Sequence, residues 1–182
     1  MSKTPATATS KAKACAASTP QAVLFDAYGT LFDVYSVALL AEQLFPGQGQ
    51  ALSLLWRDKQ IEYTRLVTTC NDGVHYRPFW ELTRAALTFA IKKLAPPAGS
   101  AGATAEFDAK VEQLMNQYRS LSAFPENREV LQTLQAQGVP TGILSNGDVA
   151  MLTLALKSSG LHAFVDHIIS VDAVKKYKTH PA

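Results

Sequence analysis

The apolar run AVLF, residues 22–25, stops directly at Asp26, and Gly29 and Thr30 follow within four residues. A short β-prone run that ends at a tight turn is typical of a buried strand. The pattern therefore predicts a carboxylate at the carboxyl end of a strand, on a rigid support. An ordinary turn aspartate that accepts backbone N–H groups gives the same pattern, so this motif alone leaves a structural role open.

A long helical region interrupts the strand pattern after this first motif. Helical spacing of apolar residues and the Pro46-Gly47 break predict four helices before residue 120, at about 39–44, 50–67, 79–94 and 105–119. The period then changes to alternating helices and short apolar strands. We expect a helix at 126–137, a strand in 139–146, a helix at 149–158 capped by Asp148, and a strand at 166–171.

Helices that alternate with short apolar strands predict a parallel sheet. We therefore expect an α/β fold with a Rossmann-like three-layer core and a helical cap inserted after the first strand. The expected parts are a disordered tail at 1–20, a core at 21–36 and 121–182 that is incomplete at its C-terminus, and a cap at 37–120. Ligands of open parallel sheets bind at the carboxyl ends of the strands.

Composition excludes several classes of protein. The formal net charge is +2 and 47% of the residues are hydrophobic, which indicates a packed core and no nucleic-acid surface. No apolar run approaches the roughly 18 residues of a membrane helix. Cys15 and Cys70 have no metal-ligand spacing, and we interpret both as free thiols of a cytoplasmic protein. The four histidines form no recognisable site, and we expect no metal.

Two further motifs fall where neighbouring strands should end. ILSNG, residues 143–147, offers Ser145, Asn146 and backbone N–H groups before a helix, which is an anion-binding arrangement. KKYK, residues 175–178, brings Lys178 to a position where it can pair with Asp26. A plain strand-to-helix turn and a solvated surface lysine are the structural alternatives.

Taken in this order, the three motifs resemble those of the haloacid dehalogenase superfamily, over residues 21–178. YGTLFDVYSV, at 28–37, and LWRDKQIEYTRL, at 55–66, are similar to the L-2-haloacid dehalogenases in particular. The resemblance implies hydrolysis of small L-2-halo acids to D-2-hydroxy acids through an aspartyl ester. It implies no cofactor, a halo acid as the small-molecule partner, and a possible homodimer.

Tyr28 separates two branches of this superfamily on chemical grounds. Superfamily phosphatases place a second aspartate two residues after the nucleophile, to protonate the alkoxide, and use magnesium to shield the phosphate. A halide is a weak base that leaves without a proton, and a halo acid carries only one carboxylate. Tyr28 therefore favours carbon–halogen cleavage over the alternative of a superfamily phosphatase.

The resemblance also implies roles for individual residues. Asp26 would be the nucleophile, Thr30 would orient it, Lys178 would neutralise it, and Arg57 would stabilise the departing halide. Ser145 belongs to the same catalytic set. The residues implied in substrate binding share a position around the expected pocket: Ala27, Tyr28, Arg57, Ile61, Phe79, Ser145 and Asn146.

Members of the family continue beyond the last residues of this sequence, with a further strand that ends in a Ser/Asn/Asp cluster. Residue 179 is Thr where the family usually has Pro. We therefore expect a sequence that is incomplete at its C-terminus, and a truncated non-catalytic fragment is the second alternative. Reading the gene beyond codon 182 would decide between them.

Overall fold

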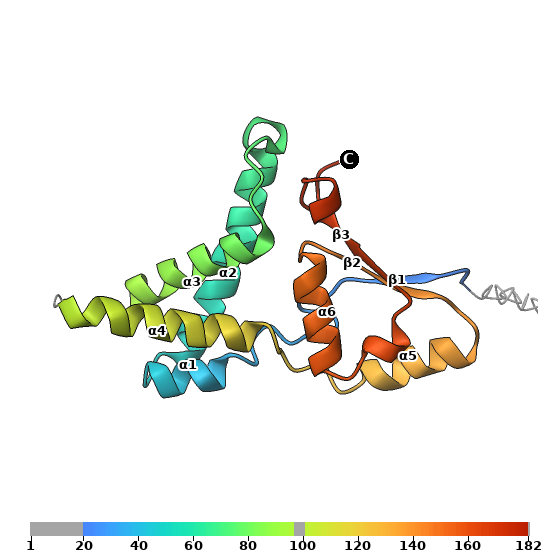
Figure 1. Cartoon of the computed structure of the whole chain (residues 1–182), viewed down its shortest axis with the longest axis horizontal. Helices are drawn as coiled ribbons and strands as arrows, with labels where there is room; N and C mark the ends of the chain where they lie inside the picture. The colour runs from blue at the N-terminus through green and yellow to red at the C-terminus, as the bar shows by residue number, and fades with distance from the viewer. Residues whose placement is uncertain (1–19, 97–100, 182) are drawn as a thin grey trace, which may run out of the picture.

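The computed structural model describes residues 20–96 and 101–181 (Figure 1). Three parallel strands form one sheet in the order β1 (Val23–Phe25), β2 (Thr141–Ser145) and β3 (His167–Ser170). Phe25 is in register with Ile143, and Ile143 with Ile168. The predicted parallel α/β sheet is thus confirmed, while the tail expected at 1–20 falls outside the described residues except for Pro20.

Helices follow β1 as far as residue 118, as expected, and in Figure 1 they lie to one side of the sheet. Their bounds are α1 (Ala38–Leu44), α2 (Gly49–Thr69), the 3₁₀ turn η1 (Cys70–Gly73), α3 (Phe79–Leu94) and α4 (Ala101–Tyr118). We call these elements the cap. The predicted helices agree to within two residues at most ends, but α4 begins four residues earlier than its sequence pattern indicated. No helix in the described ranges has the length and apolarity to cross a membrane.

The remaining elements form the core together with the sheet. They are α5 (Asn127–Ala136), α6 (Val149–Ser158), η2 (His162–Phe164), β3 and η3 (Val171–Ala173). The carboxylate of Asp148 accepts a hydrogen bond from Met151 N at 2.9 Å, which confirms the predicted helix cap. Gly138 follows α5 with a φ of +68°, a left-handed conformation that suits glycine and ends the helix there.

The two faces of the sheet differ sharply in cover. Ile143 is fully buried in one hydrophobic cluster with residues of α5 and α6. Side chains alternate across a strand, so Leu24, Leu144 and Ile169 point to the opposite face, and they are 56%, 37% and 44% exposed. The third layer of the expected three-layer core is therefore not formed by the described residues.

Close packing in the cap joins α1 to α2. A Cβ atom built on Gly49 would lie 2.6 Å from Glu42 N and 2.7 Å from Ala38 O, both backbone atoms that cannot swing away. The carboxylate of Glu42 also accepts hydrogen bonds from the N–H groups of Gly47 and Gly49. Glycine at position 49 is therefore what lets the start of α2 lie directly on α1.

We predict that Gly49→Ala lowers the free energy of unfolding by about 1–3 kcal/mol, because the added methyl group overpacks the α1–α2 contact. Thermal and urea unfolding measure the effect. Gln50→Ala, at the exposed next position of the same helix, serves as the matched control and should stay within about 0.5 kcal/mol of the parent. Equal stability of the two variants would contradict the packing argument.

Candidate functional site

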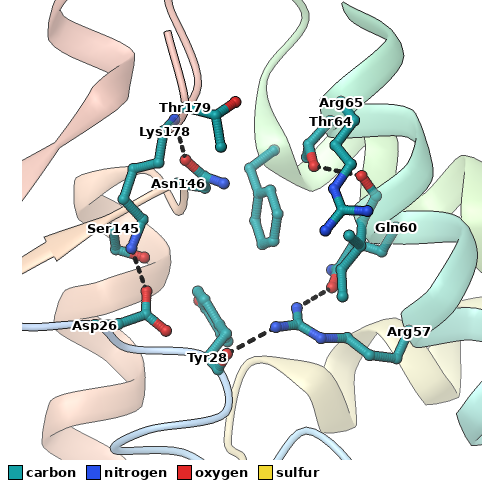
Figure 2. A pocket seen from close by; sticks show the side chains of 12 residues that line it. Asp26, Tyr28, Arg57, Gln60, Thr64, Arg65, Ser145, Asn146, Lys178 and Thr179 are labelled. Atoms are coloured by element: carbon teal, nitrogen blue, oxygen red, sulfur yellow. Dashed lines mark hydrogen bonds and ion pairs between the residues drawn. The ribbon is translucent and has the colours of Figure 1, made fainter. Parts of the chain in front are cut away.

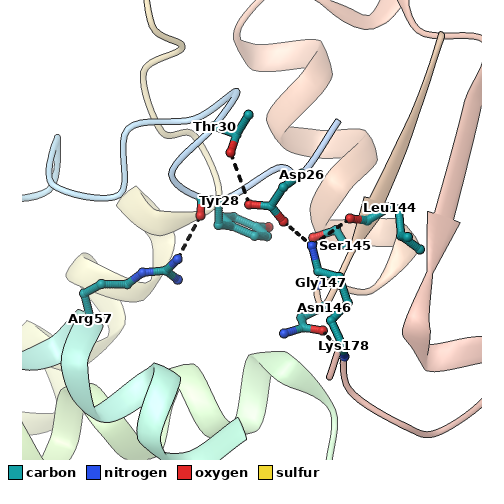
Figure 3. Close-up of polar contacts among 9 residues, drawn as sticks. All are labelled: Asp26, Tyr28, Thr30, Arg57, Leu144, Ser145, Asn146, Gly147 and Lys178. Atoms are coloured by element: carbon teal, nitrogen blue, oxygen red, sulfur yellow. Dashed lines mark hydrogen bonds and ion pairs between the residues drawn. The ribbon is translucent and has the colours of Figure 1, made fainter. Parts of the chain in front are cut away.

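Asp26 lies directly after β1 and is held from two sides (Figure 3). Lys178 Nζ donates to Asp26 Oδ1 and, at 2.9 Å, to Leu144 O at the end of β2. Thr30 Oγ1 donates to Asp26 Oδ2 at 3.4 Å. The structure therefore brings together three of the predicted catalytic residues, around a carboxylate whose charge Lys178 balances.

The loop after Asp26 is closed on itself. Ala27 O accepts hydrogen bonds from Leu31 N and Phe32 N, both at 2.9 Å, and Gly29 N donates to Phe32 O at 2.8 Å. Gly29 has a φ of +101°, a conformation that L side chains rarely adopt. This tight loop places Asp26 and Thr30 on a fixed backbone, while Ala27 itself is fully buried.

A second loop, after β2, faces the first. Ser145 is buried, and its Oγ accepts a hydrogen bond from Gly147 N at 3.1 Å. Lys178 N donates to Asn146 Oδ1 at 2.8 Å, so that the amide group of Asn146 is oriented and its Nδ2 serves as a donor. The loop thus presents a hydroxyl and an amide N–H beside the Asp26–Lys178 pair.

Lys178 sits in a strained segment of backbone. Thr179, the next residue, has a φ of +92°, well inside the left-handed region that non-glycine residues avoid. The side chain of Thr179 lines the same cavity as Lys178. The departure from the family's usual proline, seen in the sequence, therefore coincides with an unusual backbone conformation.

Arg57 reaches the site from α2 of the cap. Its Nη2 donates to Tyr28 O at 2.8 Å and its Nη1 donates to Gln60 Oε1 at 2.7 Å. Gln60 is in turn fixed by Thr83 Oγ1, which accepts from Gln60 Nε2 at 2.6 Å. All these acceptors are neutral, and none of the ion pairs in the described part of the chain includes Arg57. Its positive charge is therefore available to an anion.

Core and cap enclose a cavity of about 180 Å³ between these groups (Figure 2). The predicted residues that line it are Asp26, Tyr28, Arg57, Ile61, Phe79, Ser145, Asn146 and Lys178. Sequence reasoning missed Gln60, Thr64, Arg65 and Thr179, which line it as well. For Gln60 the sequence did hold a signal, because a glutamine three residues after Arg57 lies on the same face of a helix.

The ring of Tyr28 packs against two other aromatic rings. It lies 5.5 Å from the ring of Tyr118, nearly parallel at 21°, and 5.5 Å from that of Phe79. Burial raises the pKa of Tyr28 well above its ordinary value and raises the pKa of Tyr118 to about 12. Position 28 therefore holds a neutral phenol at physiological pH, where a phosphatase would need a carboxyl group. In the described ranges, no cluster of three His, Cys, Asp or Glu could hold a metal ion.

The site has the form expected of one enzyme family, and comparison with known proteins agrees. The sequence model of the family of haloacid dehalogenase-like hydrolases matches residues 20–182. The chain belongs to the haloacid dehalogenase-like hydrolases. Within them it belongs to the L-2-haloacid dehalogenase branch, as its relatives show.

Two curated relatives and two solved structures illustrate the similarity. Haloacetate dehalogenase H-2 of Moraxella sp. (strain B) is 37% identical over 161 residues, which cover 88% of this chain and 67% of that protein. (S)-2-Haloacid dehalogenase 4A of Burkholderia cepacia is 38% identical, with coverage of 88% and 65%. The chain thus spans about two thirds of the length of these dehalogenases.

Among the solved structures, the L-2-haloacid dehalogenase RSc1362 is 53% identical, with a TM-score of 0.78 over 90% of this chain and 69% of its own. The L-2-haloacid dehalogenase of Xanthobacter autotrophicus with chloropropionic acid covalently bound is 35% identical, with a TM-score of 0.76. That match covers 90% of this chain and 61% of the Xanthobacter protein.

We predict that the buried phenol of Tyr118 makes stability fall at high pH. The unfolded phenol ionises near pH 10, but burial raises the folded pKa to about 12, so the contribution is complete below pH 10 and is lost as the pH rises towards 12. The expected slope is roughly 1.4 kcal/mol per pH unit. Urea unfolding of the parent and Tyr118→Phe at pH 8, 10 and 11 measures it, and Tyr118→Phe should show the shallower decline. Parallel pH profiles would contradict the assignment.

Proposed function

We propose that the protein hydrolyses small L-2-halo acids to D-2-hydroxy acids through an ester on Asp26. The observation that carries the proposal is the arrangement of charges around the cavity. A carboxylate paired with Lys178 faces Arg57, whose charge has no acidic partner in the described part of the chain. The names of the relatives, which give haloacetate and (S)-2-haloacids, support this substrate class.

In the first step, a carboxylate oxygen of Asp26 attacks C2 from the side opposite the halogen. The new C–O bond forms as the C–halogen bond breaks, and the bonding electron pair leaves with the halide. Negative charge grows on the halogen in the transition state, where the guanidinium of Arg57 stabilises it. Backside attack inverts the configuration at C2. The covalently bound chloropropionic acid of the Xanthobacter relative supports such an intermediate.

In the second step, water attacks the carbonyl carbon of the Asp26 ester. The acyl–oxygen bond breaks, and one proton of the water goes to the departing alkoxide oxygen while the other passes to solvent. The hydroxy acid thus leaves with its C2–O bond intact, and the carboxylate of Asp26 is restored. Lys178 stabilises the restored charge. Because C2 is not touched in this step, the inversion from the first step is retained in the product.

The substrate carboxylate needs hydrogen-bond donors other than Thr30 and Lys178, which already bond Asp26. Ser145, Asn146 and the main-chain N–H groups of Ala27 and Tyr28 lie on the two facing loops and fit this role. Ile61 and Phe79 line the same cavity with apolar surface and would contact the alkyl group on C2. Polar groups on the core side and apolar groups on the cap side would thus orient a short 2-halo acid.

A homodimer and a cytoplasmic location complete the proposal. The second rests on cysteine chemistry, since Cys70 is exposed and carries a free thiol, which a reducing compartment preserves. Size-exclusion chromatography with light scattering tests the dimer.

A phosphatase of the same superfamily is the alternative that Tyr28 disfavours. Its buried phenol is a much weaker general acid than the carboxyl group of a phosphatase, because burial raises the pKa of Tyr28 above its ordinary value. Activity that EDTA abolishes and magnesium restores, with release of phosphate from a phosphate monoester, would favour the phosphatase. Halide release that survives EDTA favours the dehalogenase.

We predict that Asp26→Asn abolishes halide release from (S)-2-chloropropionate, because a neutral amide is a far weaker nucleophile than a carboxylate. The assay uses protein from the complete reading frame, and unchanged thermal unfolding should show that the variant is folded. Intact-protein mass must exclude deamidation of the introduced amide back to a carboxylate. Turnover by a variant that passes this check would rule out Asp26 as the nucleophile.

We predict that replacing Arg57 slows halide release by more than a loss of packing in the cap would. Arg57→Ala should slow single-turnover halide release by a hundred- to thousand-fold, about 3–4 kcal/mol of transition-state stabilisation. Arg57→Lys should recover little, since a point charge on a flexible stem does not reproduce the planar fork with which Arg57 bonds Tyr28 O and Gln60 while it faces the cavity. If Arg57 only packs the cap, the opposite follows: a shifted melting temperature, turnover within about threefold of the parent, and rescue by lysine.

A further inference from the structure

Arg65 lies on α2 eight residues after Arg57, with Ile61 midway between them. Residues four apart share one face of a helix, so the three side chains form a row about 12 Å long. All three line the cavity that Asp26 and Lys178 also line. Figure 2 shows the guanidinium of Arg65 on the same side of α2 as Arg57, above Gln60 and across the cavity from Lys178 and Thr179.

Among the described residues, no hydrogen bond or ion pair engages the guanidinium of Arg65. Glu62, one turn earlier, pairs with Lys59 at 2.6 Å instead. Arg65 also borders a shallower surface hollow with Asp58 and Glu62, so it stands at the rim of the cavity. A free, forked cation at such a rim is suited to a second carboxylate.

The charge of the cavity points the same way. Its lining holds three cations, Arg57, Arg65 and Lys178, and one anion, Asp26. These charges leave a net +2 in a half-open cavity beside the protein, where charges interact more strongly than in bulk water. A simple 2-halo acid supplies one negative charge, whereas a 2-halo dicarboxylic acid supplies two.

We propose that Arg65 binds the distal carboxylate of 2-halo dicarboxylic acids in this site. The inference rests on the proposed dehalogenase function. With the C2 carboxylate on the core loops and the halogen towards Arg57, the remaining substituent on C2 runs along Ile61. Arg65 follows on the next turn of the helix, so a short chain that passes Ile61 ends at its guanidinium. The chemistry at C2 is unchanged, and the product is a 2-hydroxy dicarboxylic acid.

The test is a ratio of specificities, measured as kcat/KM for halide release. The substrates are (S)-2-chlorobutyrate, (S)-2-chlorosuccinate and (S)-2-chloroglutarate, and the proteins are the parent, Arg65→Gln and Arg84→Gln. Arg84 is the matched control because it lies on α3 and pairs with Glu112 at 2.6 Å, outside the cavity. For at least one diacid, Arg65→Gln should lower the diacid-to-monoacid ratio about tenfold or more, as loss of one charge-assisted contact does. The ratio for Arg84→Gln should equal that of the parent.

Binding separates this inference from the proposed function. Calorimetry on Asp26→Asn and on Asp26→Asn with Arg65→Gln compares chloroglutarate and chlorosuccinate with chlorobutyrate. Tighter diacid binding that disappears with Arg65→Gln supports the inference even if no protein releases halide, an outcome that would sink the dehalogenase proposal alone. An equal loss for monoacid and diacids would mean that Arg65 attracts any anion, and an unchanged ratio would mean that it has no role. Either result overturns the inference.

Discussion

The ion pair between Asp26 and Lys178 is the contact on which the site depends. It joins residues 152 positions apart, from the end of the first strand to the segment after the third. Parallel strands bring these ends to the same edge of the sheet, so the strand order places the two residues near each other. Lys178 also bonds Leu144 O and, through its N–H, Asn146, so one residue links all three loops of the edge.

The cap is tied to this edge by contacts from the middle of α2 and from the segment that follows its C-terminal end. Arg57 bonds Tyr28 O near the middle of the helix, and beyond its C-terminal end Asp72 receives Lys176 and His180 of the core. These partners hold the pKa of Asp72 below its ordinary value, with His180 as the largest cause. Tyr76 OH adds a bond to Asp172 at 2.7 Å. Polar contacts on either side of the cavity therefore help to hold the cap against the core.

Local patterns in the sequence predicted much of the fold and of the site. Contacts between residues far apart in the sequence could not be predicted from such patterns. Strand ends, helix periods and the capping Asp148 are encoded within a few residues, which is why the sheet and the cap helices could be predicted. The contact of Gln60 with Tyr118, 58 residues away, has no local signature, and neither does the turn of Arg65 into the cavity. The exposed Leu24 and Ile169 mark the face of the sheet that the described residues leave uncovered. The site roles and the domain limits at 36 and 120 stay predictions.

Thr179 shows how a single backbone angle restricts exchange between related sequences. Its φ of +92° is closed to proline, whose ring holds φ near −65° and also confines the residue before it. Replacing Thr179 with the proline usual in the family would thus re-aim Lys178, and with it the counter-charge of Asp26. The proline that the resemblance to the family leads one to expect is incompatible with this backbone conformation, so the substitutions that position 179 tolerates depend on its backbone and not on side-chain similarity.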